Sequence, residues 1–234
     1  MNKIRKIYNT LLEHYGAQGW WPVTPIGGCS GEKDVIPVYG VTIKNEKQIL
    51  EIIIGAILTQ NTAWKNVEKA IIELNKKNLI DVNKLLIIKQ EELAQTIKSS
   101  GYFNQKAKKL KNFAVFLKKY SIKKLKNMEL NNARKLLLSI NGIGPETADS
   151  ILLYAFNKPI FVVDAYTKRI FSRIGFKEKT YDEFQALFMQ NLEHDAKLFN
   201  GYHALIVELG KNICQKKPLC DKCAINNLCE KKIN

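Results

Sequence analysis

The 234-residue sequence lacks the long apolar runs of a membrane protein. Its most apolar stretch, residues 49–58, covers about half of the roughly 20 residues that a helix needs to span a bilayer. The opening residues, Met-Asn-Lys-Ile-Arg-Lys, contain no apolar segment of the kind that a secretion signal has. We therefore expect a soluble cytoplasmic protein with reduced cysteines and no membrane partner.

The sequence also lacks the alternation of apolar and polar residues that is typical of strands, and it contains no heptad or solenoid repeat. Helical periodicity dominates, so the sequence predicts an all-α fold. A Gly/Pro-rich connection is expected at 21–40 and a short apolar extended piece at 160–163. The predicted helices cover residues 3–15, 45–58, 63–76, 82–87, 90–99, 105–120, 133–139, 146–156, 165–174, 181–191 and 196–210.

Acidic residues are scarce relative to basic ones: 22 Asp and Glu face 37 Lys and Arg, for a net charge of +15. Such an excess indicates an anionic partner, and nucleic acid is the simplest. The densest basic run, residues 106–126, interleaves lysines with apolar residues at helical spacing. It is either an amphipathic helix with a solvated basic side or a surface that contacts phosphates.

Cysteine is rare, yet four of the five cysteines lie near the C-terminus as C-x5-C-x2-C-x5-C, at Cys214, Cys220, Cys223 and Cys229. Soft thiolates bind zinc or an iron–sulfur cluster. A single close C-x-x-C pair within a short loop favours a cluster in which each sulfur meets a different iron. Zinc held by all four thiolates is the alternative. Cys29 lies outside this set and is expected to be a free thiol.

Two glycines one residue apart separate two predicted helices in the segment 139–149, Ser-Ile-Asn-Gly-Ile-Gly-Pro-Glu-Thr-Ala-Asp. Gly142 and Gly144 allow a tight turn, and Pro145 suits the first position of the following helix. The N–H groups of Ile143 and Gly144 would then face outward at the positive end of a helix dipole, where they could bind a phosphate without reading a base. The alternative is an ordinary helix–helix turn.

Asp164 follows four apolar residues and opens a predicted helix. A structural role as an N-cap is the simple alternative for such a residue. Because the hairpin and the cysteine group are also present, we predict a catalytic role instead. His14, His194 and His203 have no mutual spacing that suggests a site, so we expect them at the surface or in packing.

These three elements, in this order, resemble the helix-hairpin-helix (HhH-GPD) DNA glycosylases, and the endonuclease III branch with its [4Fe-4S] loop in particular. Segments 58–62 (Leu-Thr-Gln-Asn-Thr), 101–107 and 210–214 strengthen the resemblance, which extends from about 49 to 229. It implies two helical domains with a DNA-binding cleft between them. A six-helix domain with the hairpin would cover 46–158. Residues 1–45 and 159–234 would form a discontinuous second domain, with the iron–sulfur loop at 210–229.

The resemblance also assigns roles to residues. Asp164 would stabilise positive charge on the sugar during hydrolysis of a damaged base's N-glycosidic bond, and Gln60 would fill the space that the flipped base leaves. The four cysteines would hold a [4Fe-4S] cluster, although their first interval is x5 where endonuclease III typically has x6. The expected partner is double-stranded DNA with a damaged base, which the enzyme would bind as a monomer within the nucleoid.

Glu146 stands where bifunctional members of the family have a lysine that attacks the sugar. A carboxylate cannot form the Schiff base. We therefore predict a monofunctional glycosylase in which water captures the sugar and AP lyase activity is weak or absent. Glu146 itself would complement the helix dipole or point toward the lesion.

Trp20 and Trp21 are adjacent in a connection, so both cannot easily face one core, and we expect them to line a lesion pocket. The Trp-Trp-Pro segment and the Gly-Ile-Gly-x-Glu-x-Ala-Asp motif resemble the 3-methyladenine glycosylases, which implies stacking of cationic alkylated purines on aromatic faces. The alternatives are an endonuclease III-type glycosylase and lyase that acts on oxidised pyrimidines through another lysine, and a non-catalytic DNA-binding module. Adenine glycosylases that act on mispairs usually carry a further domain and are not expected.

Overall fold

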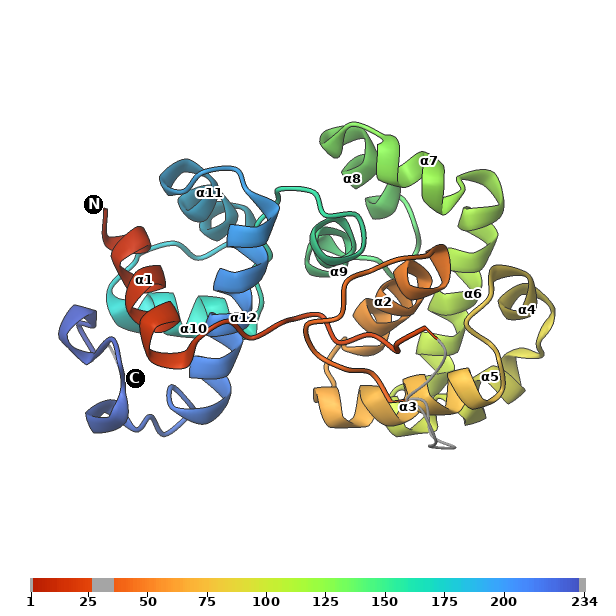
Figure 1. The fold of residues 1–234 in the computed structure, drawn as a ribbon, viewed down its shortest axis with the longest axis horizontal. Helices are drawn as coiled ribbons and strands as arrows, with labels where there is room; N and C mark the ends of the chain where they lie inside the picture. Colours follow the sequence, from red (N-terminus) through yellow and green to blue (C-terminus); the bar gives the residue numbers. More distant parts are fainter. Residues whose placement is uncertain (1, 27–35, 232–234) are drawn as a thin grey trace. The chain divides into compact units, whose positions relative to one another are not determined.

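The computed structural model describes residues 2–26 and 36–231, and their secondary structure is almost entirely helical (Figure 1). The only β pairing among them is an isolated antiparallel bridge between Val23 and Val38. The predicted all-α class is confirmed. None of the described helices is long and apolar enough to cross a bilayer. The α-helices are α1 (Lys3–Tyr15), α2 (Glu46–Leu58), α3 (Trp64–Lys76), α4 (Val82–Ile87), α5 (Gln90–Thr96), α6 (Phe103–Lys119), α7 (Ile122–Asn127), α8 (Leu130–Leu138), α9 (Pro145–Ser150), α10 (Ala165–Ile174), α11 (Tyr181–Asn191) and α12 (Ala196–Asn212).

Most helix boundaries agree with the prediction, and α7 is the helix that the prediction missed. Its N-cap is Ser121, whose hydroxyl accepts a hydrogen bond from the Lys124 amide. Only Ile122 and Leu125 are buried, so its apolar signal is too short to detect within the lysine-rich run. The predicted helix 146–156 consists of α9 followed by a π-helical turn, η2 (Ile151–Ala155).

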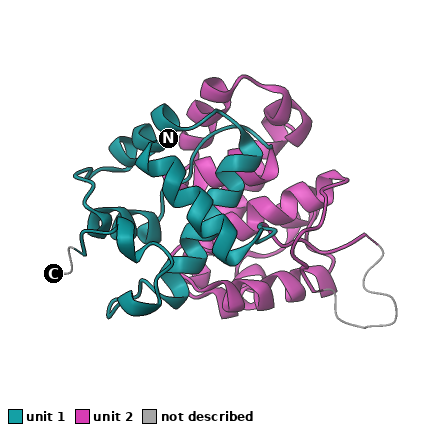
Figure 2. Ribbon diagram, turned by 60° about the vertical axis from the view of Figure 1, so that its left-hand side comes forward, with its two compact units in different colours: residues 1–20, 157–234 teal, residues 21–156 magenta. Residues whose placement is uncertain are grey.

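The chain divides into two compact units (Figure 2). Unit 1 comprises residues 1–20 and 157–234, and unit 2 comprises residues 21–156. The sequence placed residues 21–45 with the discontinuous domain, whereas the structure packs the described part of this segment within unit 2. The reason is a buried polar network: the Thr24 amide donates to Oε1 of Glu51 at 2.7 Å, and the Gln48 side chain donates to the Thr24 carbonyl at 3.1 Å.

In unit 2, α2 forms the centre of the core and contacts α3, α6 and η2. Residues 48–58 of this helix are all buried, as expected for a helix that is apolar on all sides. Gly55 allows a close approach of Trp21, because a Cβ there would stand 3.0 Å from the Trp21 ring. The N-terminus of α2 is capped by Asn45, which accepts a hydrogen bond from the Gln48 amide.

In unit 1, α12 packs against α1 and α10, and aromatic rings fill the core. Phe161 stacks on Phe188 with ring centroids 3.7 Å apart, and Tyr202 meets both rings edge-on. The Tyr202 hydroxyl donates to the Ile4 carbonyl at 2.9 Å, which joins the N-terminal helix to α12. This core supports the extended segment 160–163, which leads directly to Asp164.

Candidate active site

Asp164 is the N-cap of α10, and its carboxylate is held at both oxygens. Oδ1 accepts hydrogen bonds from the amide and the hydroxyl of Thr167, at 2.7 and 2.8 Å. Oδ2 lies 3.6 Å from Nε2 of His203, and only 12% of the Asp164 side chain is exposed. The capping role therefore exists, but it uses one oxygen and leaves the other for electrostatic interactions.

His203 is a site residue that the sequence analysis missed. It was expected at the surface or in packing; it is buried on α12, and its Nε2 faces Oδ2 of Asp164. Sequence spacing gave no signal for this pair, because it exists only where α12 packs against α10. A buried histidine beside a capping carboxylate is the arrangement that keeps such a carboxylate charged.

The pKa of Asp164 reflects a balance of opposing effects. Burial raises the pKa, but the nearby N–H and positive charge of His203, together with the hydrogen bonds from Thr167, outweigh burial and hold the pKa below its usual range. The carboxyl group is therefore ionised at neutral pH while most of its surface is removed from water. An anion of this kind interacts strongly with a nearby cation.

The glycine hairpin lies between α8 and α9, as predicted, with Gly142 at a φ of 93° and Pro145 in the first turn of α9. Gly144 is exposed and forms the N-cap. The Ile143 amide does not face outward as predicted, because it donates to the Ile140 carbonyl at 3.0 Å inside the hairpin. The N–H groups available to bind a phosphate are therefore those of Gly144 and of the first turn of α9.

A buried ion pair holds the two helices of the hairpin together. Nε and Nη2 of Arg134, on α8, donate to the two oxygens of Asp149, on α9, at 2.7 and 3.1 Å. The Asp149 side chain is completely buried. Such a two-point contact fixes the angle between the helices as well as their distance.

Gln60 lies just after α2, and its side chain is bound to the hairpin of the same unit. Its Nε2 donates to the Gly142 carbonyl at 3.1 Å and to the Thr147 hydroxyl at 2.9 Å. Its Oε1 accepts a hydrogen bond from Nζ of Lys109. The residue predicted to enter the duplex is therefore held against the predicted phosphate site.

The remaining predicted residues have different surroundings. Glu146 is exposed in the first turn of α9. Trp21 is buried in unit 2, where its ring meets Trp64 and Tyr154 with centroids 5.4 and 5.2 Å apart. Trp20 belongs to unit 1 and is half-buried. The two adjacent tryptophans thus belong to different units, and Trp21 is a core residue.

The four predicted metal-ligating cysteines line one pocket in unit 1, together with Arg173, Ile213, Pro218, Leu219, Asn226 and Lys231. Two N–H groups point at their sulfurs: Arg173 donates to Sγ of Cys214, and the Lys231 amide donates to Sγ of Cys229, each at 3.3 Å. Burial raises the pKa of Cys223, and the charges of the other three cysteines raise it further. The four sulfurs are therefore close enough to interact, and a metal centre would stabilise their thiolate forms. Cys29 lies outside the described residues.

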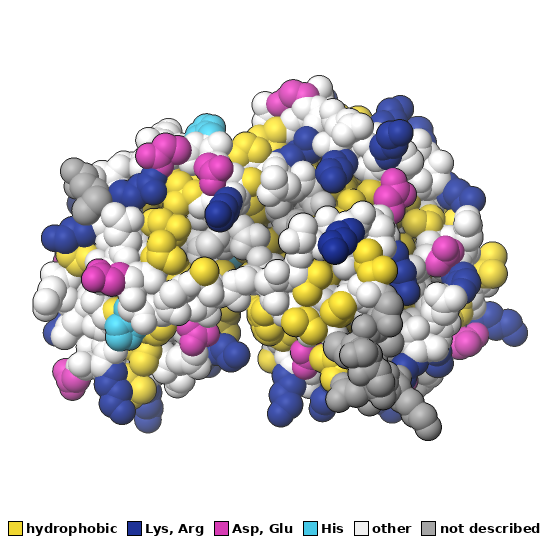
Figure 3. Space-filling view, in the orientation of Figure 1, with side chains coloured by type: hydrophobic (Ala, Val, Ile, Leu, Met, Phe, Trp, Pro, Cys, Tyr) yellow, Lys and Arg dark blue, Asp and Glu magenta, His cyan; other side chains and the backbone are white. Residues whose placement is uncertain are grey.

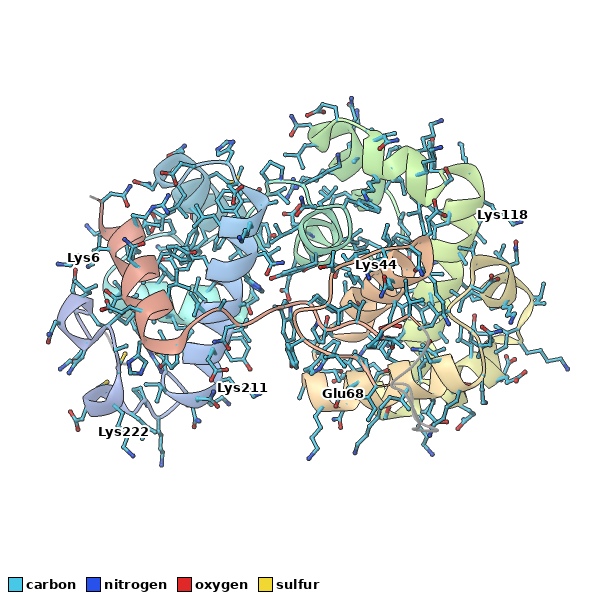
Figure 4. The ribbon with its side chains drawn as sticks, viewed as in Figure 1. Lys6, Lys44, Glu68, Lys118, Lys211 and Lys222 are labelled. Carbon is cyan, nitrogen blue, oxygen red and sulfur yellow. The ribbon has the colours of Figure 1, made fainter. Side chains whose placement is uncertain are left out.

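Positive charge is spread over the molecule. Figure 3 shows Lys and Arg side chains distributed over the visible face of each unit. Lys211 lies in the last turn of α12, and Lys222 lies between Cys220 and Cys223, both in unit 1 (Figure 4). The basic excess therefore belongs to several surfaces.

Comparison with known proteins identifies the family. The family model for the HhH-GPD superfamily base excision DNA repair proteins matches residues 54–194. A protein of Methanocaldococcus jannaschii that is named as a candidate DNA repair glycosylase is 44% identical over 97% of this chain and 95% of its own length. Endonuclease III of Thermotoga maritima is 31% identical over 80% of this chain and 86% of its own length.

A solved structure gives the same result. The crystal structure of H. pylori 3-methyladenine DNA glycosylase (MagIII), bound to 1,N6-ethenoadenine, matches with a TM-score of 0.67 and 27% identity, over 90% of this chain and 98% of that one. The chain belongs to the HhH-GPD superfamily of base excision DNA repair proteins and is a DNA glycosylase of that family.

Proposed function

We propose that this glycosylase hydrolyses the N-glycosidic bond of an alkylated purine, such as 3-methyladenine, that is flipped out of duplex DNA. The observation that carries the proposal is the Asp164 carboxylate, which is buried, ionised and held by Thr167 and His203. Breaking the bond develops positive charge on the deoxyribose. A carboxylate already fixed in a poorly solvated place stabilises that charge without reorganising.

The same carboxylate can orient or deprotonate the water that captures the sugar. Oδ2, which is not part of the helix cap, is the oxygen available for this task, because Oδ1 is bound twice by Thr167. Nε2 of His203, 3.6 Å from Oδ2, helps to hold the pKa of the Asp164 carboxyl low, so the carboxyl is charged before each turnover. Flipping the target base costs a few kcal/mol, and less for a damaged base, which favours lesions over intact nucleotides.

The enzyme is proposed to be monofunctional because Glu146 occupies the position of the lyase lysine in bifunctional relatives. This side chain is exposed and lies in the first turn of α9. It cannot form an imine with the sugar. The Asp164 carboxylate therefore acts with water as the nucleophile, and the reaction ends at an intact abasic strand.

Alkylated purines are proposed as substrates because of two observations. The likeness to MagIII, whose structure contains an ethenoadenine, covers nearly the whole chain. Trp20 is also only half-buried, and a cationic base could stack on an indole ring. The second candidate is an oxidised-pyrimidine glycosylase and lyase, which the likeness to T. maritima endonuclease III favours.

DNA is proposed to bind through the hairpin and the cysteine loop. The exposed N-terminus of α9 at Gly144 suits a phosphate, as the N-termini of helices do in general. Lys216, Lys217 and Lys222 lie on the loop between Cys214 and Cys229, where they could meet further phosphates. Once the damaged base is flipped, Gln60 is proposed to fill the gap in the duplex.

The cysteine pocket is proposed to hold a [4Fe-4S] cluster with a structural role. Four thiols line it, and N–H groups of Arg173 and Lys231 face two of the sulfurs, as is usual around clusters. No group of three or more His, Cys, Asp or Glu side chains in residues 2–26 and 36–231 is arranged to hold one metal ion directly. The cluster is preferred to zinc because the four cysteines contain a single close C-x-x-C pair within one short loop.

The test is a base-release screen on DNA that carries single defined lesions, with and without borohydride. The proposal expects free 3-methyladenine and no covalent adduct. Release confined to oxidised pyrimidines, or a trapped protein–DNA adduct, supports the second candidate instead. Binding of abasic DNA without release of any base contradicts both.

A further inference from the structure

Lys109, on α6, contacts both Gln60 and the glycine hairpin, two parts of unit 2 that the proposed function uses. Its ammonium donates to Oε1 of Gln60, and its aliphatic stem lies on the hairpin. Three stem carbons of Lys109 stand 2.6 to 3.0 Å from the point where a Cβ on Gly142 would be. Asn112, one turn later on α6, approaches the same hairpin, with Nδ2 3.4 Å from the Asn141 carbonyl. This face of α6 therefore lies along the turn proposed to bind phosphate.

A second lysine makes this region more positive. Lys106 is almost completely buried, and its ammonium donates to the Leu58 carbonyl, the Thr62 hydroxyl and the Ser100 carbonyl at 2.6 to 2.7 Å. All three acceptors are neutral oxygens. Burial, with a smaller contribution from the charge of Lys109, lowers the pKa of Lys106 to about 8.

Across the described residues, no carboxylate forms an ion pair with Lys106 or Lys109. The Arg134 guanidinium, also close to the hairpin helices, is matched by Asp149. Two neighbouring cations that have only neutral acceptors give this side of the hairpin a local excess of positive charge, which attracts an anion.

We propose that Lys109 binds a DNA phosphate beside the hairpin, and that it leaves the Gln60 side chain when it does so. The inference rests on the proposed function and adds a side-chain contact to the backbone donors of the hairpin. A neutral amide oxygen is a weaker partner for an ammonium than a phosphate is, because the phosphate adds the attraction between opposite charges. The exchange frees Oε1 of Gln60, the residue proposed to enter the duplex.

The test compares Lys109→Met with a matched control on the same helix. Methionine keeps an apolar stem over Gly142 and removes the charge. Lys118 is exposed and extends from α6 away from its neighbours (Figure 4). It lies nine residues after Lys109, and therefore about 180° around the helix. Lys118→Met thus removes the same charge from the opposite face.

The probe is a duplex with one tetrahydrofuran abasic analogue, which cannot be processed, so binding is measured without catalysis. The slope of log Kd against log salt concentration should fall by about 0.9 in Lys109→Met, which is the loss of one phosphate contact. It should stay at the wild-type value in Lys118→Met. Lys109→Arg keeps the charge and should restore the slope, which excludes misfolding as the cause.

A second background separates phosphate binding from the contact with Gln60. In Gln60→Ala, the further change Lys109→Met should still lower the slope by about 0.9. An unchanged slope in either background overturns the inference, because Lys109 would then act only as a support for Gln60. Wild-type protein that does not bind the abasic duplex at all contradicts the proposed function itself, so the two failures are distinguishable.

Discussion

The ion pair between Arg134 and Asp149 should be the most costly polar interaction to break in unit 2. Asp149→Asn replaces one acceptor oxygen with a donor, which then faces an N–H group of Arg134. Removing one partner of a buried pair costs about 3–5 kcal/mol. Since 23% of the Arg134 side chain is exposed, water can partly compensate, and we expect a loss near the lower limit, about 3 kcal/mol. That corresponds to roughly a hundredfold change in the unfolding equilibrium.

Urea unfolding followed by circular dichroism measures this loss. Glu73→Gln is the matched control, since the exposed pair of Glu73 with Lys76 should contribute about 1 kcal/mol or less. Combining Asp149→Leu with Arg134→Met removes both charges and should cost less than Asp149→Asn alone, because no charge stays buried. If Asp149→Asn destabilises the protein no more than Glu73→Gln does, the pair does not hold the hairpin.

Two further predictions concern titratable groups whose pKa is raised by partial or full burial. Burial raises the pKa of Glu51, so the folded state binds the proton of this carboxyl more tightly than the unfolded state does. The protonated carboxyl therefore adds to the free energy of unfolding at low pH, and this contribution is lost as pH rises through the raised pKa. Glu51→Gln should therefore lose less stability than the wild type between acidic and neutral pH in urea titrations. Parallel plots of the free energy of unfolding against pH for the two proteins would contradict this. Cys223→Ser should reduce the iron and acid-labile sulfide of anaerobically purified protein, whereas stoichiometric zinc without sulfide in the wild type would contradict the cluster.

Features encoded by neighbouring residues could be predicted from the sequence. The helices follow from periodicity and caps, and Asp164 follows from a carboxylate placed between an apolar segment and a helix start. The four cysteines were also recognisable, because their spacing within one loop is a local property. These cysteines do line one pocket in the structure.

Features that depend on packing between distant segments could not be predicted. His203 reaches Asp164 only because α12 packs on α10. The contacts of Gln60 with Lys109 and Thr147 depend on α6 and the hairpin meeting the end of α2. Adjacent residues can also separate, as Trp20 and Trp21 do where the chain passes from one unit to the other. Even within the hairpin, the turn conformation decided that the Ile143 amide bonds internally.

The most direct test of the central claim is the single-turnover rate of 3-methyladenine release by Asp164→Asn. Asparagine preserves a helix cap and removes only the charge, so the fold should persist. Asp195→Asn is the control, because Asp195 caps α12 in the same way, by accepting a hydrogen bond from the Leu198 amide at 2.6 Å. We predict that Asp164→Asn lowers the rate by a factor of about 100 or more while abasic DNA still binds, and that Asp195→Asn keeps the wild-type rate. Release at the wild-type rate by Asp164→Asn would contradict the assignment of this carboxylate.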